Sequence, residues 1–265
     1  MTPTVDWDTV YAGYAAARTA VLSGDEPTAP FELPDAAVAR IAAPADEDVR
    51  WLTQALRDQE RKWLVAELAR RSESLGEVFF TPMLDAGIDE VNPSFNRSFI
   101  EPCVRAFGHR RVNEYLLGVV ESGSDFRKAG AVNAMYWAQV PLSFVGSVPS
   151  FTTEHATPES RAAYEAVSDL RERKRLLLLD TFLSNPSVDV RRSIIPSLNL
   201  DPAAYPATHR PLVAQAIEIA RGSEDEYIRH RVEVQLGNVT ALAPLPHREA
   251  GGDRAESDTA PDPAT

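Results

Sequence analysis

Two stretches of the sequence decide the fold when they are read together: Leu176–Leu198, LLLLDTFLSNPSVDVRRSIIPSL, and Leu212–Leu236, LVAQAIEIARGSEDEYIRHRVEVQL. Each stretch begins with an apolar run of helical length, passes through a short polar turn, and ends in a second segment with an arginine near its start. In both second segments, apolar residues stand one position before the arginine, three after it and seven after it. This spacing lays an apolar stripe along one face of a helix. The two stretches therefore predict two copies of one helix–turn–helix unit.

The turn inside each unit carries residues that end one helix and start the next. Pro186 disfavours a helical conformation at Asn185, and a proline ring suits the first turn of the following helix. In the second unit we expect Gly222 to end the first helix and Ser223 to cap the next, with Glu226 completing a capping box. Both units are therefore predicted to contain a tight turn.

The arginine that marks the second helix is Arg191 in one unit and Arg229 in the other, and it recurs upstream. Weaker copies stand at Arg61, Arg97 and Arg127; we call all five the register arginines. The successive intervals are 36, 30, 64 and 38 residues, and 64 is close to two repeats. Helical repeats of this kind run about 30–47 residues. The register predicts an all-α, right-handed α-solenoid of antiparallel helix pairs. Its buried stripe is expected to include Leu64, Leu68, Ile194, Leu198, Val232 and Leu236.

One segment carries a family resemblance. Ser187–Leu198, SVDVRRSIIPSL, resembles the second helix of a HEAT repeat, which opens with an Asp-Val-Arg-like sequence and continues with spaced apolar residues. Ser124–Ala131, SDFRKAGA, looks like a degenerate copy. The resemblance covers about residues 46–240. It implies that Arg191 and Arg229 are structural, each bonding an acidic group of the neighbouring repeat.

Two prolines depart from the repeat pattern, and three regions lie outside it. Pro102 and Pro196 fall within second helices, where they should bend the helix or shift its start. Residues 138–160 hold three prolines and show no helical period, so we expect an irregular insertion. The predicted organisation is an N-terminal capping helix (7–22) and linker (23–45) in residues 1–45, a HEAT-like solenoid in 46–244, and a disordered acidic tail in 245–265, which is too poor in apolar groups to offset its ordering entropy.

The composition restricts the location and the class of partner. The 265 residues carry a net charge of −12 and only three lysines among 27 basic residues, whereas nucleic-acid binding needs a concentrated basic surface. No apolar run approaches the roughly 18 residues of a membrane span, and the first residues lack a secretory-signal pattern. Cys103 is the one cysteine and cannot form an internal disulfide. We therefore expect a cytoplasmic protein with no nucleic-acid or membrane partner; its Arg-rich, Lys-poor composition is associated with GC-rich bacterial genomes.

The common catalytic and cofactor-binding patterns do not occur in the sequence. None of the five histidines has a His or Cys three or four positions away, and phosphate-binding glycine loops and the Gly-x-Ser-x-Gly motif are missing. A HEAT-like enzyme, deoxyhypusine hydroxylase, holds iron with repeated His-Glu pairs, but this sequence contains no His-Glu dipeptide. Cys103 has apolar neighbours, which favours an inert buried thiol. The expectation is no enzyme activity, no cofactor and no metal.

A partner surface is expected near Asn133-Ala-Met-Tyr-Trp137 and the insertion that follows. Aromatic residues and methionine are enriched at interface cores, and long loops inside compact folds are often functional. A basic pair upstream adds a local positive feature to an acidic chain. The candidate binding residues are Arg110, Arg111, Asn133, Tyr136 and Trp137. The alternative is that Tyr136 and Trp137 complete the core while the insertion covers it.

Two functions from different classes remain. The first is a non-enzymatic scaffold that binds another protein on a curved helical-repeat surface. The second is a HEAT-like DNA-repair glycosylase, for which Tyr136, Trp137, Arg110 and Arg111 would supply part of a basic, aromatic DNA-binding face. The acidity of the chain weighs against the second function, and no residue supports a third, small-molecule enzyme. We therefore expect a protein-binding module.

Overall fold

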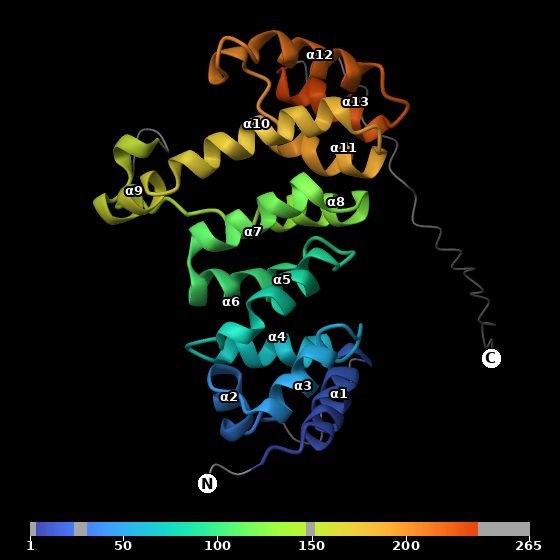
Figure 1. Ribbon diagram of the computed structural model, residues 1–265, viewed down its shortest axis with the longest axis vertical. Coiled ribbons are helices and arrows are strands. Elements are labelled where there is room, and N and C mark those ends of the chain that lie inside the picture. Colours follow the sequence, from blue (N-terminus) through green and yellow to red (C-terminus); the bar gives the residue numbers. More distant parts are fainter. Residues whose placement is uncertain (1–3, 24–30, 147–151, 238–265) are drawn as a thin grey trace, which may run out of the picture.

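The computed structural model describes residues 4–23, 31–146 and 152–237, and in these ranges the chain is helical (Figure 1). The only pairing of strand type among them is one isolated bridge between Phe144 and Ala156. The prediction of an all-α fold is therefore confirmed. Among the same residues, no helix combines the length and apolar character needed to cross a bilayer.

The α-helices follow one another along the whole described chain. They are α1 (Trp7–Ser23), α2 (Asp35–Ala42), α3 (Asp46–Ala55), α4 (Lys62–Arg71), α5 (Phe80–Ile88), α6 (Arg97–Phe107), α7 (His109–Ser122), α8 (Asp125–Ala134), α9 (Pro158–Glu165), α10 (Ser168–Ser184), α11 (Val188–Ile194), α12 (Arg210–Arg221) and α13 (Glu226–Gln235). Short 3-10 turns occur at Glu77–Phe79, Thr153–His155, Ile195–Ser197 and Pro202–Ala204.

From α4 onward the helices stack in two rows, in chain order along the long axis (Figure 1). In the first row α4 packs on α6, α6 on α7, α7 on α10, and α10 on α12. In the second row α5 packs on α8, α8 on α11, and α11 on α13. Across the rows, α5 packs on α6, α7 on α8, α10 on α11, and α12 on α13. The chain thus alternates between two rows whose helices bury their inner faces against each other.

The order in which the chain visits the two rows reverses at α5 and α6. This reversal decides which row each register arginine belongs to. The pairs α7–α8, α10–α11 and α12–α13 each place their first helix in the first row, whereas α5 lies in the second row and α6 in the first. Arg127, Arg191 and Arg229 therefore mark helices of the second row. Arg61, just before α4, and Arg97, at the start of α6, mark helices of the first row, although α4 and α6 are the second members of the packed pairs α3–α4 and α5–α6. Their i, i+4 apolar neighbours are a feature of any amphipathic helix.

The predicted stripe is largely buried. Leu64, Leu68, Ile194, Leu198 and Val232 are buried. Leu236 was also expected in the core, but it is only partly covered because it caps the C-terminal end of α13.

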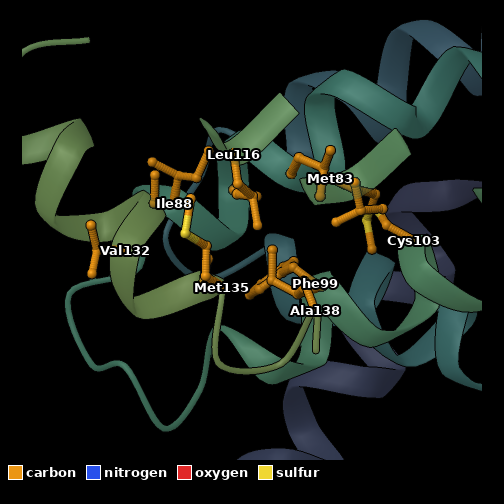
Figure 2. Close-up of a cluster of buried hydrophobic side chains, with 14 of the residues drawn as sticks. Met83, Ile88, Phe99, Cys103, Leu116, Val132, Met135 and Ala138 are labelled. Atoms are coloured by element: carbon orange, nitrogen blue, oxygen red, sulfur yellow. The ribbon is translucent and has the colours of Figure 1, made fainter. Parts of the chain in front are cut away.

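The centre of the stack lies between α5, α6, α7 and α8 (Figure 2). The residues labelled there come from these four helices and the turn that follows α8. They include Met83, Ile88, Phe99, Cys103, Leu116, Val132, Met135 and Ala138, and each is at most 3% exposed. Burying a large apolar side chain stabilises the fold by about 1.5–3 kcal/mol. This cluster ties the two rows together.

The predicted turns form, with one change of capping residue. α10 ends at Ser184, and Asn185 Oδ1 accepts a hydrogen bond from the backbone amide of Ser187 at 2.8 Å. In the later unit the cap of α13 is Asp225, whose Oδ1 accepts from the Ile228 amide at 2.9 Å. Ser223 instead accepts from the Asp225 amide at 3.2 Å. The prediction of Ser223 as the cap is wrong because the helix starts two residues later, where an aspartate reaches the free amide.

The stretch 23–45 is not a plain linker. It contains α2, an alanine-rich helix whose Ala37 and Ile41 are fully buried against the rest of the core. In the expected insertion, the described residues up to 157 form one short 3-10 turn and the bridge between Phe144 and Ala156, and α9 begins at Pro158. The tail, 245–265, lies outside the described residues.

The two prolines act differently. Pro102 lies buried inside α6, and the helix continues through it to Phe107. Pro196 ends α11, which gives way to the 3-10 turn Ile195–Ser197.

Cys103 is expected to be unreactive while the protein is folded. Its side chain is fully buried, and burial raises the pKa of the thiol to about 12. The reactive thiolate is therefore both rare and shielded at pH 8. Ellman's reagent should give no colour with the native protein and one equivalent after unfolding in guanidinium. One equivalent from the native protein would show that α6 does not face the core as described.

Candidate functional site

A groove of about 780 Å³ lies beside the predicted aromatic pair, between α6, the start of α7, the segment after α8, and α9. We call it the aromatic groove. Its lining is mainly apolar and includes four polar or charged residues. The lining residues are Val104, Tyr136, Trp137, Val140, Pro141, Leu142, Phe144 and Tyr164, together with Glu101, Arg105, His109 and Gln139.

Tyr136 and Trp137 have different roles in this groove. The chain leaves α8 in tighter turns, in which the amide of Tyr136 donates to the Asn133 carbonyl. Trp137 is partly buried, and its Nε1 donates to the carbonyl of Pro93 at 3.2 Å. The guanidinium of Arg97 lies 5.1 Å from its ring centroid. Trp137 therefore holds the turn before α6 against the end of α8. This agrees in part with the alternative that Trp137 completes the core.

Tyr136, in contrast, points to solvent. Its side chain is 66% exposed, and its ring packs edge-on against Trp137 at a centroid distance of 4.8 Å. An exposed aromatic residue supported from behind by a second aromatic ring is a rigid, apolar contact surface at low entropic cost.

The Ala138 carbonyl anchors the wall of the groove that lies against the start of α7. The Ala138 oxygen accepts from His109 Nδ1 at 3.0 Å and from Asn113 Nδ2 at 2.9 Å. Because a carbonyl can only accept, His109 carries its proton on Nδ1 in this contact. The start of α7 thus fixes the point where the chain turns away from α8 into the irregular segment.

The wall of the groove that contains Leu142 and Phe144 is hydrogen-bonded to the start of α9. The Ser143 carbonyl accepts from the Thr157 amide at 2.8 Å, and the Ser143 amide donates to Ser160 Oγ at 3.1 Å. Arg171 stacks on the ring of Tyr164, with its guanidinium carbon 3.5 Å from the centroid. Both walls are therefore held by hydrogen bonds or ring contacts before any partner binds.

Arg110 is ion-paired and lies outside the groove lining. Its guanidinium forms a bidentate contact with Asp169 at 2.8 and 2.9 Å and donates to the Ala166 carbonyl at 2.6 Å. Hydrogen bonds from Arg110 lower the pKa of the Asp169 carboxyl to about 2. Arg110 therefore joins α7 to the start of α10.

Arg111 is ion-paired in the same way, with the 3-10 turn that precedes α5. It forms a bidentate ion pair with Glu77, and its guanidinium carbon lies 4.0 Å from the ring centroid of Phe80. Arg110 and Arg111 are each about half exposed and ion-paired with one carboxylate, so the positive charge expected there is compensated within the chain. Asn133 lies in α8, where its carbonyl supports the turn to Tyr136.

Of the three later register arginines, Arg127 alone forms an ion pair with the preceding repeat among the described residues. Arg127 pairs with Asp85 and Asp89 at the end of α5. Arg191 Nε donates to the Phe182 carbonyl at 3.1 Å, and Arg229 donates to the Ser223 carbonyl, so the acidic partners expected for both are wrong. The contact between the last two repeats is instead made by the next residue, Arg192, which pairs with Asp225 at 2.8 Å.

In the first row, Arg61 lies 3.6 Å from an Asp8 carboxylate oxygen, and Arg97 pairs with Glu101 at 2.8 Å. Arg61 therefore fastens α1 to the stack, while the Arg97 pair lies within one helix.

Sequence reasoning identified the aromatic side of the groove but missed the rest. His109, Leu142, Phe144 and Tyr164 reach the groove from separate elements, and no periodicity connects them. Comparison of this chain with protein-family models, curated proteins and solved structures found no match.

Proposed function

We propose that this chain is a HEAT-like α-solenoid that binds another protein in the aromatic groove and has no catalytic role of its own. The two rows of alternating helices and the Arg127 contacts to α5 support the solenoid part of the proposal. A stack of this kind offers extended surface for a partner.

The observation that carries the binding proposal is the exposure of Tyr136 at the mouth of a groove with an apolar lining. Aromatic side chains are enriched at the centre of protein interfaces and often dominate the binding energy. The walls are internally bonded, so a partner would bind with little ordering cost.

The cations at the groove favour protein over DNA. Arg105 donates to the carbonyls of Ala69 and Ser72 at 2.7 and 3.2 Å. His109 is bonded to the Ala138 carbonyl. Phosphate binding requires cations that are free to contact the backbone, and Arg110 and Arg111 are ion-paired as well. No observation supports the glycosylase alternative.

Affinity capture tests this proposal. The tagged full chain is incubated with an extract of its native host, and captured proteins are compared between wild type and Tyr136→Ala. Loss of a central aromatic contact costs about 2 kcal/mol or more at a hot spot, so recovery of the partner should fall by at least about tenfold. Val21→Ala is the matched control, because Val21 is 68% exposed on α1. Equal recovery by Tyr136→Ala and wild type would contradict the proposal.

A further inference from the structure

One wall of the aromatic groove is an extended stretch of chain, residues 140–145, which contains no helical turn. It is called the wall segment below. Phe144 takes part in the antiparallel bridge to the chain before α9. Both backbone groups of Ser143 point the same way: its carbonyl accepts from the Thr157 amide at 2.8 Å, and its amide donates to Ser160 Oγ at 3.1 Å. The edge of the wall segment that faces α9 is therefore already hydrogen-bonded.

The opposite edge of the wall segment is open at Leu142. The backbone groups of consecutive residues in an extended chain point to opposite edges, so those of Leu142 point away from α9. Within the described parts of the chain, neither the amide nor the carbonyl of Leu142 forms a hydrogen bond. Buried backbone groups are almost always paired, and Leu142 is only partly buried, so this edge faces solvent. An open edge of this kind is a template to which a second extended chain can add.

The side chains of the wall segment supply apolar lining to the groove beside this edge. Val140, Leu142 and Phe144 line it at alternate positions, as does Pro141 between them. Side chains in an extended chain alternate between two faces, so a chain added at the open edge would place every second side chain over the same groove. Tyr136, 66% exposed, stands there as a contact surface. A free backbone edge beside an apolar groove for alternate side chains is the arrangement used in binding by strand addition.

The charge of the lining favours an uncharged segment. The lining holds one carboxylate, Glu101, and one guanidinium, Arg105, so their formal charges cancel. Glu101 is paired with Arg97 at 2.8 Å, and Arg105 donates to two carbonyls at the end of α4. A charged side chain over the groove would gain no net attraction there and would lose hydration. Main-chain hydrogen bonds to Leu142, in contrast, need no charge on the bound segment.

We propose that the partner enters the aromatic groove as an extended, uncharged segment that adds as a strand to the open edge of the wall segment. Its backbone bonds the amide and carbonyl of Leu142, and its alternate apolar side chains pack on Tyr136 and the groove lining. A helix laid over this edge would cover both groups of Leu142 without pairing them, at the cost of unmade hydrogen bonds. The inference rests on the proposed function and adds to it the conformation and chemistry of the bound segment.

Peptides selected by phage display test the proposal. A random library is enriched on the immobilised full chain, and peptides that lose binding to Tyr136→Ala are retained. Each residue of a retained peptide is then N-methylated in turn. Loss of an N–H that bonds the wall segment should weaken binding by about two- to tenfold, and sensitive positions should alternate with tolerant ones, because only every second N–H faces the wall segment.

Amide exchange of the full chain, followed by NMR, gives the second readout. Saturation with a retained peptide should slow exchange of the Leu142 amide by at least about tenfold, because a free amide becomes hydrogen-bonded. The Ser143 amide is the internal control: it is already bonded to Ser160 Oγ, so its exchange should change little.

The contradicting results separate this inference from the proposed function. If peptides that require Tyr136 tolerate N-methylation at every position, or leave Leu142 exchange unchanged, strand addition is overturned while the proposed function stands. Enrichment of charged or helical peptides that require Tyr136 has the same meaning. If no enriched peptide requires Tyr136, the inference fails, and capture of the whole partner by wild type and Tyr136→Ala still decides the proposed function.

Discussion

Replacing Ile194 by alanine is expected to lower the free energy of unfolding by roughly 2–5 kcal/mol. Ile194 is fully buried near the end of α11, the helix that packs on α8, α10 and α13. Removing its branched side chain leaves a cavity between both rows, where neighbouring helices can collapse only partly. Urea denaturation followed by circular dichroism measures the change.

Val188→Ala is the control on the same helix. Val188 is about half exposed, so its loss should change stability by no more than about 0.5 kcal/mol. Equal effects of the two substitutions would show that the buried face of α11 is assigned wrongly.

A pair of glycine substitutions is expected to act in opposite directions. Gly130 lies in α8, and a Cβ atom there would stand 2.0 Å from the carbonyl oxygen of Ile88. Because that atom belongs to the backbone of α5, the two helices would have to move apart. Overpacking of this kind typically costs about 1–3 kcal/mol, so Gly130→Ala should be destabilising.

Gly118→Ala is the matched change in α7, where an added Cβ atom meets nothing within 4 Å. Alanine favours a helix over glycine by about 0.5–1 kcal/mol, so this substitution should raise the melting temperature. Calorimetry of both variants measures the signs. Stabilisation by both would show that α8 does not approach α5 as closely as described.

The second-row helices could be predicted from sequence because their apolar stripes are long and regular. Val190 and Ile194 in α11, and Ile228 and Val232 in α13, occupy the predicted faces and are buried. At α8 the same rule fails: Phe126 is exposed, and Gly130 replaces the next stripe residue because the helix lies directly on the backbone of Ile88.

The missed features depend on small residues or on distant partners. The helix α2 is short and rich in alanine, and its only large apolar residues, Val38 and Ile41, are too few to indicate a buried face from sequence. Arg110 meets Asp169 and Arg111 meets Glu77, at separations of 59 and 34 residues. Only the packing of α7 against other elements brings these carboxylates close. The sequence indicated the aromatic side of the groove, Tyr136 and Trp137. The other lining residues come together only when the chain folds.

The central claim, that another protein binds in the aromatic groove, is tested most directly by photo-crosslinking. The photoreactive residue p-benzoylphenylalanine is placed at position 136 of the full chain in its native host, with position 21 as the control. Both sites are exposed, at 66% and 68%. The proposal predicts one discrete crosslinked protein from position 136 and none from position 21. No adduct at 136, or the same set of adducts from both positions, would contradict it.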